Sequence, residues 1–144
     1  MTDTYLSLGS NLGDRHYMIV RAIELLARRV GRLVCVSSIV ETEPWGFKSI
    51  HPFLNAVVLL HTDLTPRQLL AETQAIEREL GRTKKTQADT YADRPIDIDI
   101  LLYGERQVNE TDLIIPHPLM NERDFVIKPL QEIHNSLQKK YPIA

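Results

Sequence analysis

The stretch Arg94-Pro95-Ile96-Asp97-Ile98-Asp99-Ile100-Leu101-Leu102-Tyr103 alternates between apolar and acidic side chains along its centre. Alternation is the period of a β-strand, in which successive side chains point to opposite faces. Asp97 and Asp99 therefore share one face, about 6.6 Å apart along the strand. The opposite face is expected to carry Ile96, Ile98, Ile100 and Leu102. The stretch predicts a strand that buries one face and gathers two carboxylates on the other.

Two carboxylates this close repel each other, so a strand keeps them where they face water or where a cation lies between them. The first alternative is a solvated strand face. The second is a Mg²⁺ site, because Mg²⁺ usually binds through one or two carboxylates together with substrate phosphates. Arg94, directly upstream, is placed to add a bidentate contact to a phosphate. The pattern by itself leaves both alternatives open.

Two helices are expected before this strand. The first follows a turn at residues 9–14 and ends near residue 30, with Gly31 as its C′ residue. Its apolar stripe, spaced by four, three and four, consists of Ile19, Ile23, Leu26 and Val30. The second has Thr65 as N-cap, Pro66 at its first position and Gln68 to complete a capping box, and it ends at Gly81.

Strands are expected at residues 4–9, 33–43, 53–62 and at the carboxylate stretch, followed by a short extension from residue 113 onward. The element order is β-α-β, β-α-β. This order favours a ferredoxin-like α+β fold, a two-layer sandwich of one antiparallel sheet with two helices packed on it. No repeat, linker or low-complexity tract divides the sequence, so we expect one domain over residues 1–144.

Charge and composition exclude several classes of protein. The 144 residues carry a net charge of −2 and have a pI near 6.2, so no general basic field favours nucleic acid or an anionic membrane. The one cysteine, Cys35, is interpreted as a buried structural thiol. No apolar run reaches the roughly 18 residues of a membrane span and no signal peptide is visible, so we expect a cytoplasmic protein.

Two long loops flank the predicted core. Loops of this size, at residues 44–52 and 82–93, are uncommon in a small domain and often act as lids. The second is rich in cationic side chains and leads directly to Arg94 and the carboxylate strand, a combination suited to an anionic polyphosphate. The alternative is a pair of solvated surface loops.

Several blocks of the chain occur in a familiar order and spacing. They are residues 6–14, Thr42-Glu43-Pro44-Trp45-Gly46, and residues 53–56, 76–82, 94–101, 116–118 and 123–130. In these blocks the chain resembles the 6-hydroxymethyl-7,8-dihydropterin pyrophosphokinase family of folate biosynthesis. The resemblance covers nearly the whole chain.

The resemblance implies a ferredoxin-like fold and an ATP-dependent transfer. The pyrophosphoryl group of ATP would pass to the hydroxymethyl oxygen of 6-hydroxymethyl-7,8-dihydropterin, with release of AMP and with two Mg²⁺ ions bound. Such an in-line displacement depends mainly on positioning and on neutralising charge.

The resemblance also implies roles for particular residues. The expected catalytic residues are Arg82, Arg94, Asp97 and Asp99, and the two aspartates would hold the metal ions. The expected ATP contacts are Gln74, Glu77, Arg82, Lys84, Arg94, Ile100, His117 and Arg123. The expected pterin contacts are Thr42, Glu43, Trp45, Phe53, Asn55, Tyr91, Asp97 and Phe125, with the two phenylalanines stacked on its faces.

Other classes of protein share this element order. A regulatory ligand-binding module needs neither the paired aspartates nor the cationic loop. An RNA-binding module needs exposed aromatic residues and a basic face, which three phenylalanines and a net charge of −2 disfavour. We therefore expect a monomer that binds ATP and the pterin, and neither nucleic acid nor membrane.

Overall fold

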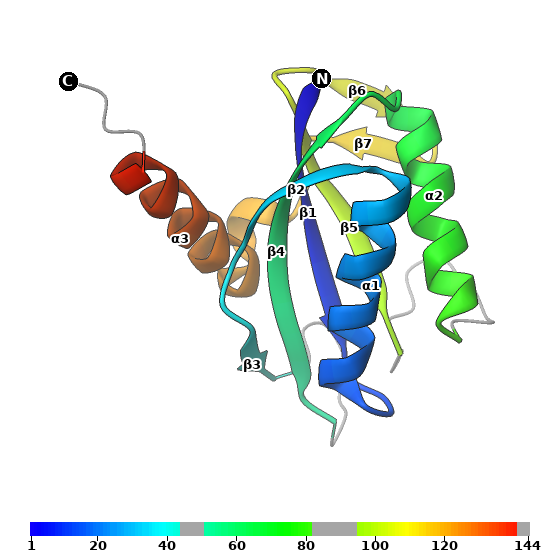
Figure 1. Cartoon of the computed structure of the whole chain (residues 1–144), viewed down its shortest axis with the longest axis vertical. Coiled ribbons are helices and arrows are strands. Elements are labelled where there is room, and N and C mark those ends of the chain that lie inside the picture. Colours follow the sequence, from blue (N-terminus) through cyan, green and yellow to red (C-terminus); the bar gives the residue numbers. More distant parts are fainter. Residues whose placement is uncertain (44–50, 82–94, 141–144) are drawn as a thin grey trace.

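The structure is a computed structural model and describes residues 1–43, 51–81 and 95–140 (Figure 1). Its elements are β1 (Thr2–Ser10), α1 (Arg15–Arg29), β2 (Gly31–Val36), β3 (Val40–Thr42), β4 (Phe53–Thr62), α2 (Pro66–Glu79), β5 (Asp97–Tyr103), β6 (Val108–Glu110), β7 (Leu113–Ile115), the 3-10 helix η1 (Met120–Glu122) and α3 (Asp124–Lys140). Within these residues, no helix is both long enough and apolar enough to span a membrane.

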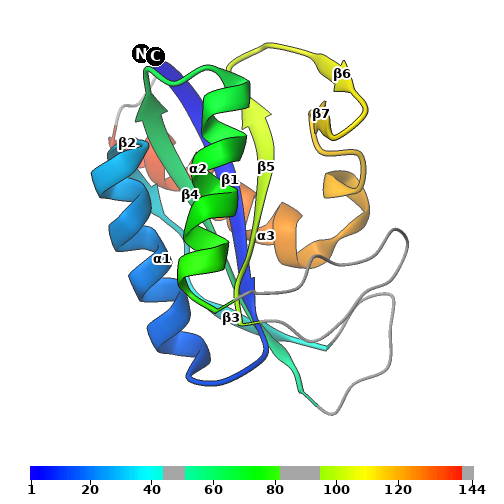
Figure 2. The ribbon, with the colours of Figure 1, turned by 90° about the vertical axis from the view of Figure 1, so that its right-hand side faces the viewer.

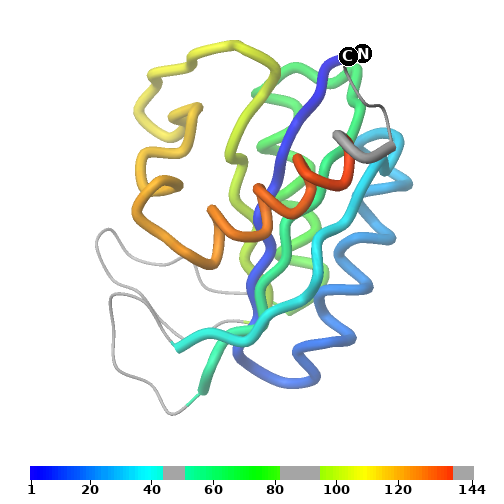
Figure 3. The backbone as a smooth tube through the Cα atoms, turned by 90° about the vertical axis from the view of Figure 1, so that its left-hand side faces the viewer, coloured from blue at the N-terminus to red at the C-terminus, as the bar shows by residue number. Residues whose placement is uncertain are grey.

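Strands β2, β4, β1 and β5 lie side by side in that order, and β3 pairs with β4. Every pairing in this sheet is antiparallel. Helices α1 and α2 lie together on one face of the sheet (Figures 1 and 2). Figure 3 shows α3 crossing the opposite face. The arrangement confirms the predicted ferredoxin-like sandwich and adds a helix on its second face.

The predicted start of the second helix is confirmed in detail. Thr65 accepts the Gln68 N–H at 3.2 Å, and the Gln68 side chain accepts the Thr65 N–H at 2.9 Å, so the capping box is closed on both sides. Pro66 occupies the first position of α2, as predicted. Gly81 follows the helix with φ of 105°, a conformation that favours glycine.

Gly31 has a different role from the one that its position suggests. Helix α1 ends before it, as predicted, but Gly31 is not among the glycines with positive φ and opens β2 instead. A β-carbon at this position would lie 2.0 Å from the carbonyl oxygen of His61 on β4. Glycine is therefore required by the close approach of two strands and not by a left-handed turn.

The sheet buries apolar side chains on both faces. The cluster beneath α1 and α2 includes Leu6, Leu8, Ile19, Leu26, Leu69, Ile76, Ile96, Ile98 and Ile100. The cluster beneath α3 includes Val57, Leu59, Leu101, Val126 and Ile133. Two hydrophobic layers on one sheet hold the strands rigidly, which gives the polar side chains at its edge a fixed scaffold.

The strand predicted over residues 33–43 is wrong as a single element, because the chain leaves the ladder between β2 and β3. Ser37 Oγ accepts the Val57 N–H at 2.8 Å, and Ser38 donates from both its N–H and its Oγ to Glu132 of α3, each at 2.8 Å. A carboxylate from a distant helix thus replaces the strand partner at this point. Sequence alternation alone does not reveal such a contact.

The prediction that Leu102 shares a face with Ile100 is also wrong. Leu6 pairs with Ile100 but Tyr5 pairs with Leu102, so Leu101 is an extra residue in β5 and forms a β-bulge. After the bulge the alternation changes face, and Leu102 packs in the cluster beneath α3. The aspartates precede the bulge, so their predicted face is unaffected.

The short extension expected from residue 113 is larger than predicted. The hairpin β6–β7 starts at Val108, and the chain continues through η1 into α3, a helix of 17 residues. Pro129 lies inside α3 and masks its helical pattern, because proline removes a backbone donor from the helix interior. This extension matters for function because it supplies two side chains that approach Asp99.

Candidate active site

Asp97 and Asp99 share one face of β5, as the alternation predicts. Gly9 of β1 pairs with Asp97, and Ser7 pairs with Asp99. Ile98, between the aspartates, belongs to the cluster beneath α1 and α2, so both carboxylates point to the face on which α3 packs. Both aspartates are half-buried. The sheet therefore presents a carboxylate pair at the start of its edge strand.

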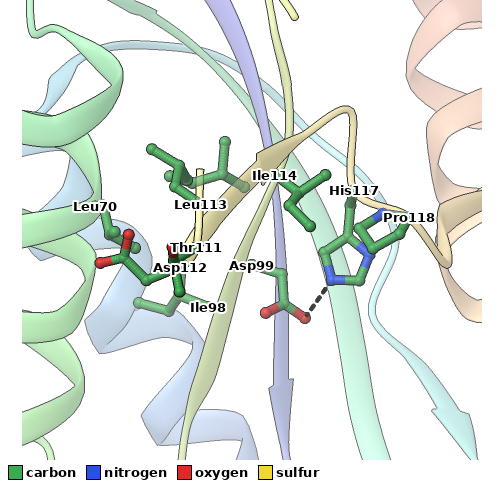
Figure 4. A pocket seen from close by; sticks show the side chains of 10 residues that line it. Leu70, Ile98, Asp99, Thr111, Asp112, Leu113, Ile114, His117 and Pro118 are labelled. Carbon is green, nitrogen blue, oxygen red and sulfur yellow. Dashed lines mark ion pairs between the residues drawn. The ribbon is translucent and has the colours of Figure 1, made fainter. Parts of the chain in front are cut away.

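Two nitrogen-bearing side chains approach Asp99 from the segment after β7. His117 Nε2 and Arg123 Nη1 each lie 3.9 Å from Asp99 Oδ2, and Figure 4 marks the pair with His117. Arg123 is only 8% exposed, and its guanidinium carbon lies 5.5 Å from the centroid of the Phe125 ring. The ring and the burial hold a positive charge in one place beside the carboxylates.

His117 is held in one orientation and one tautomer. Its backbone N–H donates to the Leu101 carbonyl of β5 at 3.0 Å, and its Nδ1 accepts the Leu119 N–H at 3.2 Å. Burial lowers the pKa of His117 below its usual value, the Arg123 charge lowers it further, and Asp97 opposes both effects. The imidazole is therefore neutral at pH 7, with its proton on Nε2, the nitrogen on the side of Asp99.

A buried amide lies in the same row of the sheet as Asp97. Asn55 of β4 pairs with Gly9, which pairs with Asp97 on its other side. Paired residues of an antiparallel sheet point to the same face, so Asn55 and Asp97 flank Gly9. Asn55 is 4% exposed, and its Nδ2 donates to Thr42 Oγ1 of β3 at 2.6 Å. Thr42 is thus the partner that a buried amide requires.

Gly9 keeps the middle of this row free of side-chain atoms. A β-carbon there would lie 3.1 Å from Asn55 Oδ1 and 3.4 Å from the ring of Phe53. Phe53 is half-buried on β4, two residues before Asn55 and so on the same face. No local sequence pattern singles out Gly9 as a site residue, although it lies in the block over residues 6–14 that supports the family resemblance.

The two remaining pterin candidates in the described residues lie on α3 and directly after β3. Phe125 is half-buried in α3 and packs with the cluster on the same face of the sheet. Glu43 is exposed and directly follows Thr42 of β3. The structure therefore brings an amide, a carboxylate and two aromatic rings onto one face.

A pocket of about 290 Å³ lies beside Asp99, between α2, β5 and the β6–β7 hairpin (Figure 4). It is lined by Leu70, Ile98, Asp99, Ile100, Thr111, Asp112, Leu113, Ile114, His117 and Pro118. Two residues predicted to contact ATP, Ile100 and His117, meet here with Asp99, which was predicted to hold a metal ion. The hairpin residues and Leu70 were not predicted; Leu70 adjoins the apolar stripe of α2, which is the one signal that points to it.

Two further ATP candidates lie on α2. One carboxylate oxygen of Glu77 accepts the Ile98 N–H at 2.9 Å, which joins α2 to the outer edge of β5. Gln74 lies one turn earlier and is exposed. Glu77 therefore has a structural contact as well as a position close to the pocket wall at Ile98.

Five predicted site residues lie outside the described residues: Trp45, Arg82, Lys84, Tyr91 and Arg94. Most of the two predicted lid loops lies outside them as well. The chain just after the first gap is anchored by two unpredicted contacts. Asn11 Nδ2 donates to the His51 carbonyl at 3.1 Å, and Arg15 Nη1 donates to the Pro52 carbonyl at 2.9 Å.

The two aspartates offer oxygen ligands where a metal ion was predicted. Within residues 1–43, 51–81 and 95–140, no group of three or more histidine, cysteine, aspartate and glutamate side chains is arranged to hold a metal ion. Asp97 and Asp99 form a pair. Two carboxylates with the other positions left to water and phosphate match the preference of Mg²⁺, not that of zinc or copper.

Comparison with known proteins gives consistent results at the level of sequence. Residues 5–135 match the model of the 7,8-dihydro-6-hydroxymethylpterin-pyrophosphokinase (HPPK) family. The chain is 55% identical over 143 residues to a 2-amino-4-hydroxy-6-hydroxymethyldihydropteridine pyrophosphokinase of Porphyromonas gingivalis, covering 99% of this chain and 97% of that protein. It is 43% identical over 137 residues to the Bacillus subtilis protein of the same name, covering 94% and 80%.

Solved structures support the fold. A crystal structure of an HPPK-DHPS in complex with substrates matches 99% of this chain with a TM-score of 0.74 at 15% identity. The wild-type Plasmodium falciparum HPPK-DHPS with pteroate matches 91% with a TM-score of 0.69 at 16% identity. This chain spans 45% and 38% of those two chains, less than half of each. The extent of the family match and the identity to its relatives lead to one conclusion: the chain belongs to the 7,8-dihydro-6-hydroxymethylpterin pyrophosphokinase family.

Proposed function

We propose that this chain transfers the pyrophosphoryl group of ATP to the hydroxymethyl oxygen of 6-hydroxymethyl-7,8-dihydropterin, releasing AMP, in folate biosynthesis. The observation that carries the proposal is the position of the carboxylate pair. Asp97 ends the row that contains Asn55 and Gly9, and Asp99 lines the pocket. An amide-lined aromatic face and an apolar pocket thus meet at two adjacent carboxylates.

The row around Gly9 suits the pterin ring. A pterin is flat and carries an amide-like edge, which a fixed side-chain amide can recognise. Asn55 is fixed in this way by its hydrogen bond to Thr42, and Phe53 and Phe125 are aromatic side chains on the same face. Stacking on such rings and pairing with one oriented amide would place the hydroxymethyl group toward Asp97.

The pocket beside Asp99 suits the nucleotide. Its walls are largely apolar, with Leu70, Ile100 and Ile114 among them, and its volume approaches that of small-ligand pockets. The neutral Nε2–H of His117 and the buried guanidinium of Arg123 lie at the Asp99 end, where phosphate oxygens would need donors. Gln74 and Glu77 remain proposed nucleotide contacts because α2 forms one wall.

Asp97 and Asp99 fit Mg²⁺, since they offer two oxygen ligands on one strand face. When bound, two Mg²⁺ ions would neutralise phosphate charge and favour the hydroxyl nucleophile. The contribution of the chain is to hold the two carboxylates in fixed positions on a rigid strand. Ile98 and Ile100, buried on the other face, lock that strand against α2.

The proposed reaction is a single in-line displacement. The pterin hydroxymethyl oxygen forms a bond to the β-phosphorus of ATP, and the bond from that phosphorus to the α,β-bridging oxygen breaks. AMP leaves with the bridging oxygen, and the hydroxyl proton passes to solvent. Arg123 is positioned to balance phosphate charge, and Arg82 and Arg94, which lie outside the described residues, are proposed to add catalytic charge as the transfer proceeds.

The test is to detect both products by mass spectrometry after mixing the protein with Mg²⁺, ATP and hydroxymethyldihydropterin. Wild-type protein should form AMP and the pterin diphosphate in equal amounts. Asp97→Asn should abolish both, whereas Asp63→Asn, which alters an exposed aspartate paired with the N-terminus, should not. Formation of ADP, or equal activity in all three proteins, would refute the proposal.

Titration calorimetry separates the proposal from a non-catalytic binding module. An enzyme of this kind should bind a nonhydrolysable ATP analogue with Mg²⁺ and then the pterin, whereas a regulatory module need not bind either. The predicted monomeric state and cytoplasmic location stay predictions. Sedimentation of the purified protein and fractionation of its host cells would test them.

A further inference from the structure

The β6–β7 hairpin forms one wall of the pocket, yet it lies outside the main sheet. Each strand has three residues, and Thr111 and Asp112 form the tip between Glu110 and Leu113. A two-stranded hairpin is marginally stable by itself in water. Leu113 and Ile115 are buried and anchor β7 in the core, whereas Glu110, Thr111 and Asp112 are exposed. Core packing therefore holds β7, and the exposed tip beside it is held through polar contacts.

Arg67 of α2 supplies these contacts. Its Nη1 donates to Asp112 Oδ2 at 2.9 Å, and its Nη2 lies 2.7 Å from Asp112 Oδ1, so the guanidinium and the carboxylate form a two-pronged pair. Arg67 Nε donates to Glu110 Oε1 at 2.7 Å, and Nη2 contacts the same oxygen. Hydrogen bonds to Asp112 and Glu110 raise the pKa of Arg67, and the hydrogen bond from Arg67 lowers the pKa of Asp112.

This cross-link spans the rim of the pocket. Leu70, one helical turn after Arg67, lines the pocket from α2, and Thr111 and Asp112 line it from the hairpin. Figure 4 shows Leu70 beside Thr111 and Asp112, with Asp99 and His117 at the other end of the pocket. The distance between α2 and the hairpin tip is therefore set at the end away from the carboxylate pair.

We propose that Arg67 is a positioning residue that clamps the hairpin tip to α2 and so sets the width of the pocket for the nucleotide base. The inference rests on the proposed function, because it takes the occupant of this pocket to be the base of ATP. Arg67 acts through Asp112 and Glu110 and touches no reacting atom. Its planar fork, which matches a carboxylate in two parallel hydrogen bonds, makes lysine an incomplete substitute.

The clamp predicts a selective effect on the nucleotide. In Arg67→Gln, the KM for ATP and the dissociation constant of an ATP analogue should rise about three- to tenfold, because the wall must now be ordered on binding. The kcat at saturation and the KM for the pterin should stay within about twofold of wild type. Discrimination between ATP and GTP should weaken. Arg67→Lys should fall between Arg67→Gln and wild type.

The matched control is Arg29→Gln. Arg29 makes a comparable two-pronged pair with Glu79, at 2.5 Å and 3.0 Å, and joins α1 to α2, but neither residue lines the pocket. This variant loses an exposed cross-link of the same kind and should keep the wild-type KM for ATP. If Arg67→Gln left the KM for ATP within twofold of wild type, the clamp would be refuted. The clamp would also be refuted if Arg67→Gln and Arg29→Gln changed the kinetic constants to the same extent.

A second measurement separates the clamp from the proposed function. Hydrogen exchange at residues 108–115 should quicken in Arg67→Gln and not in Arg29→Gln, with or without nucleotide. Equal exchange in wild type and Arg67→Gln would overturn the clamp even in an active enzyme. A wild-type protein that binds no ATP analogue would overturn the proposed function, and with it the assignment of the base to this pocket.

Discussion

Gly9→Ala is a single-methyl test of the pterin site. The new β-carbon would lie 3.1 Å from Asn55 Oδ1 and 3.4 Å from the Phe53 ring, so these neighbours must move by a few tenths of an ångström. Gly9 is not among the glycines with positive φ, and its backbone therefore accepts alanine without strain. Overpacking of this kind costs about 1–3 kcal/mol.

The methyl group would occupy the open middle of the row between Asn55 and Asp97. We expect the affinity for the pterin to fall by at least about tenfold, equivalent to about 1.4 kcal/mol. The affinity for an ATP analogue should change less than about twofold, because the pocket lining does not include Gly9. Unfolding should remain cooperative.

Titration calorimetry with Mg²⁺ and the ATP analogue, followed by the pterin, gives both affinities in one protein. The nucleotide titration is the internal control for folding, and a thermal melt measures the cost in stability. If Gly9→Ala bound the pterin as tightly as wild type, the site would lie elsewhere. If both ligands weakened equally, the effect would be on the fold and the reasoning would fail.

Asn55→Ala should weaken pterin binding while nearly sparing the ATP analogue, since loss of a hydrogen bond to a buried partner costs about 1–3 kcal/mol; equal loss for both ligands would make Asn55 structural. Asp97→Ala and Asp99→Ala should each lower AMP production by several orders of magnitude yet stay folded, because carboxylate repulsion is relieved; more than a tenth of wild-type activity in either variant would refute the two-metal site. The pKa of His117 is lowered in the folded protein, so below the usual histidine pKa of about 6.5 the unfolded state binds a proton at His117 more readily than the folded state does. The free energy of unfolding, measured without metal or nucleotide, should therefore fall as the pH drops. Denaturant unfolding of His117→Gln should show a weaker fall between pH 6.5 and 5; an identical fall would show that His117 contributes nothing.

Local patterns predicted the parts of the structure that local physics decides. Alternation placed Asp97 and Asp99 on one face, and the capping signals placed the start of α2 at Pro66. The bounds of β4, Phe53–Thr62, agree with the predicted strand as well. In each case the signal and its structural consequence lie within a few residues of each other.

The errors arise where distant residues decide the outcome. Glu132 of α3 bonds to Ser38 across 94 positions and interrupts the strand predicted there. The bulge at Leu101 depends on pairing with β1 and moves Leu102 to the second face. No periodicity in one segment contains this information, because it depends on tertiary contacts.

The pocket was missed for a related reason. Its lining joins Leu70 of α2 to hairpin residues about 40 positions later, and Arg67 links the two elements through its hydrogen bond to Asp112. Family resemblance pointed to Ile100 and His117, but no local pattern in the sequence predicts the opposite wall of the pocket. The structure adds the spatial proximity of residues that are distant in the sequence and carry only weak local signals.

The most direct measurement of the central claim is a crystal structure of this protein with Mg²⁺, a nonhydrolysable ATP analogue and hydroxymethyldihydropterin. The base should lie in the pocket beside Leu70 and Asp112, and the pterin should lie over Gly9 against Asn55. The β-phosphorus and the hydroxymethyl oxygen should face each other at Asp97 and Asp99, with Mg²⁺ on both carboxylates. A pterin bound away from the row of Asn55, Gly9 and Asp97, or phosphates remote from both aspartates, would contradict that claim.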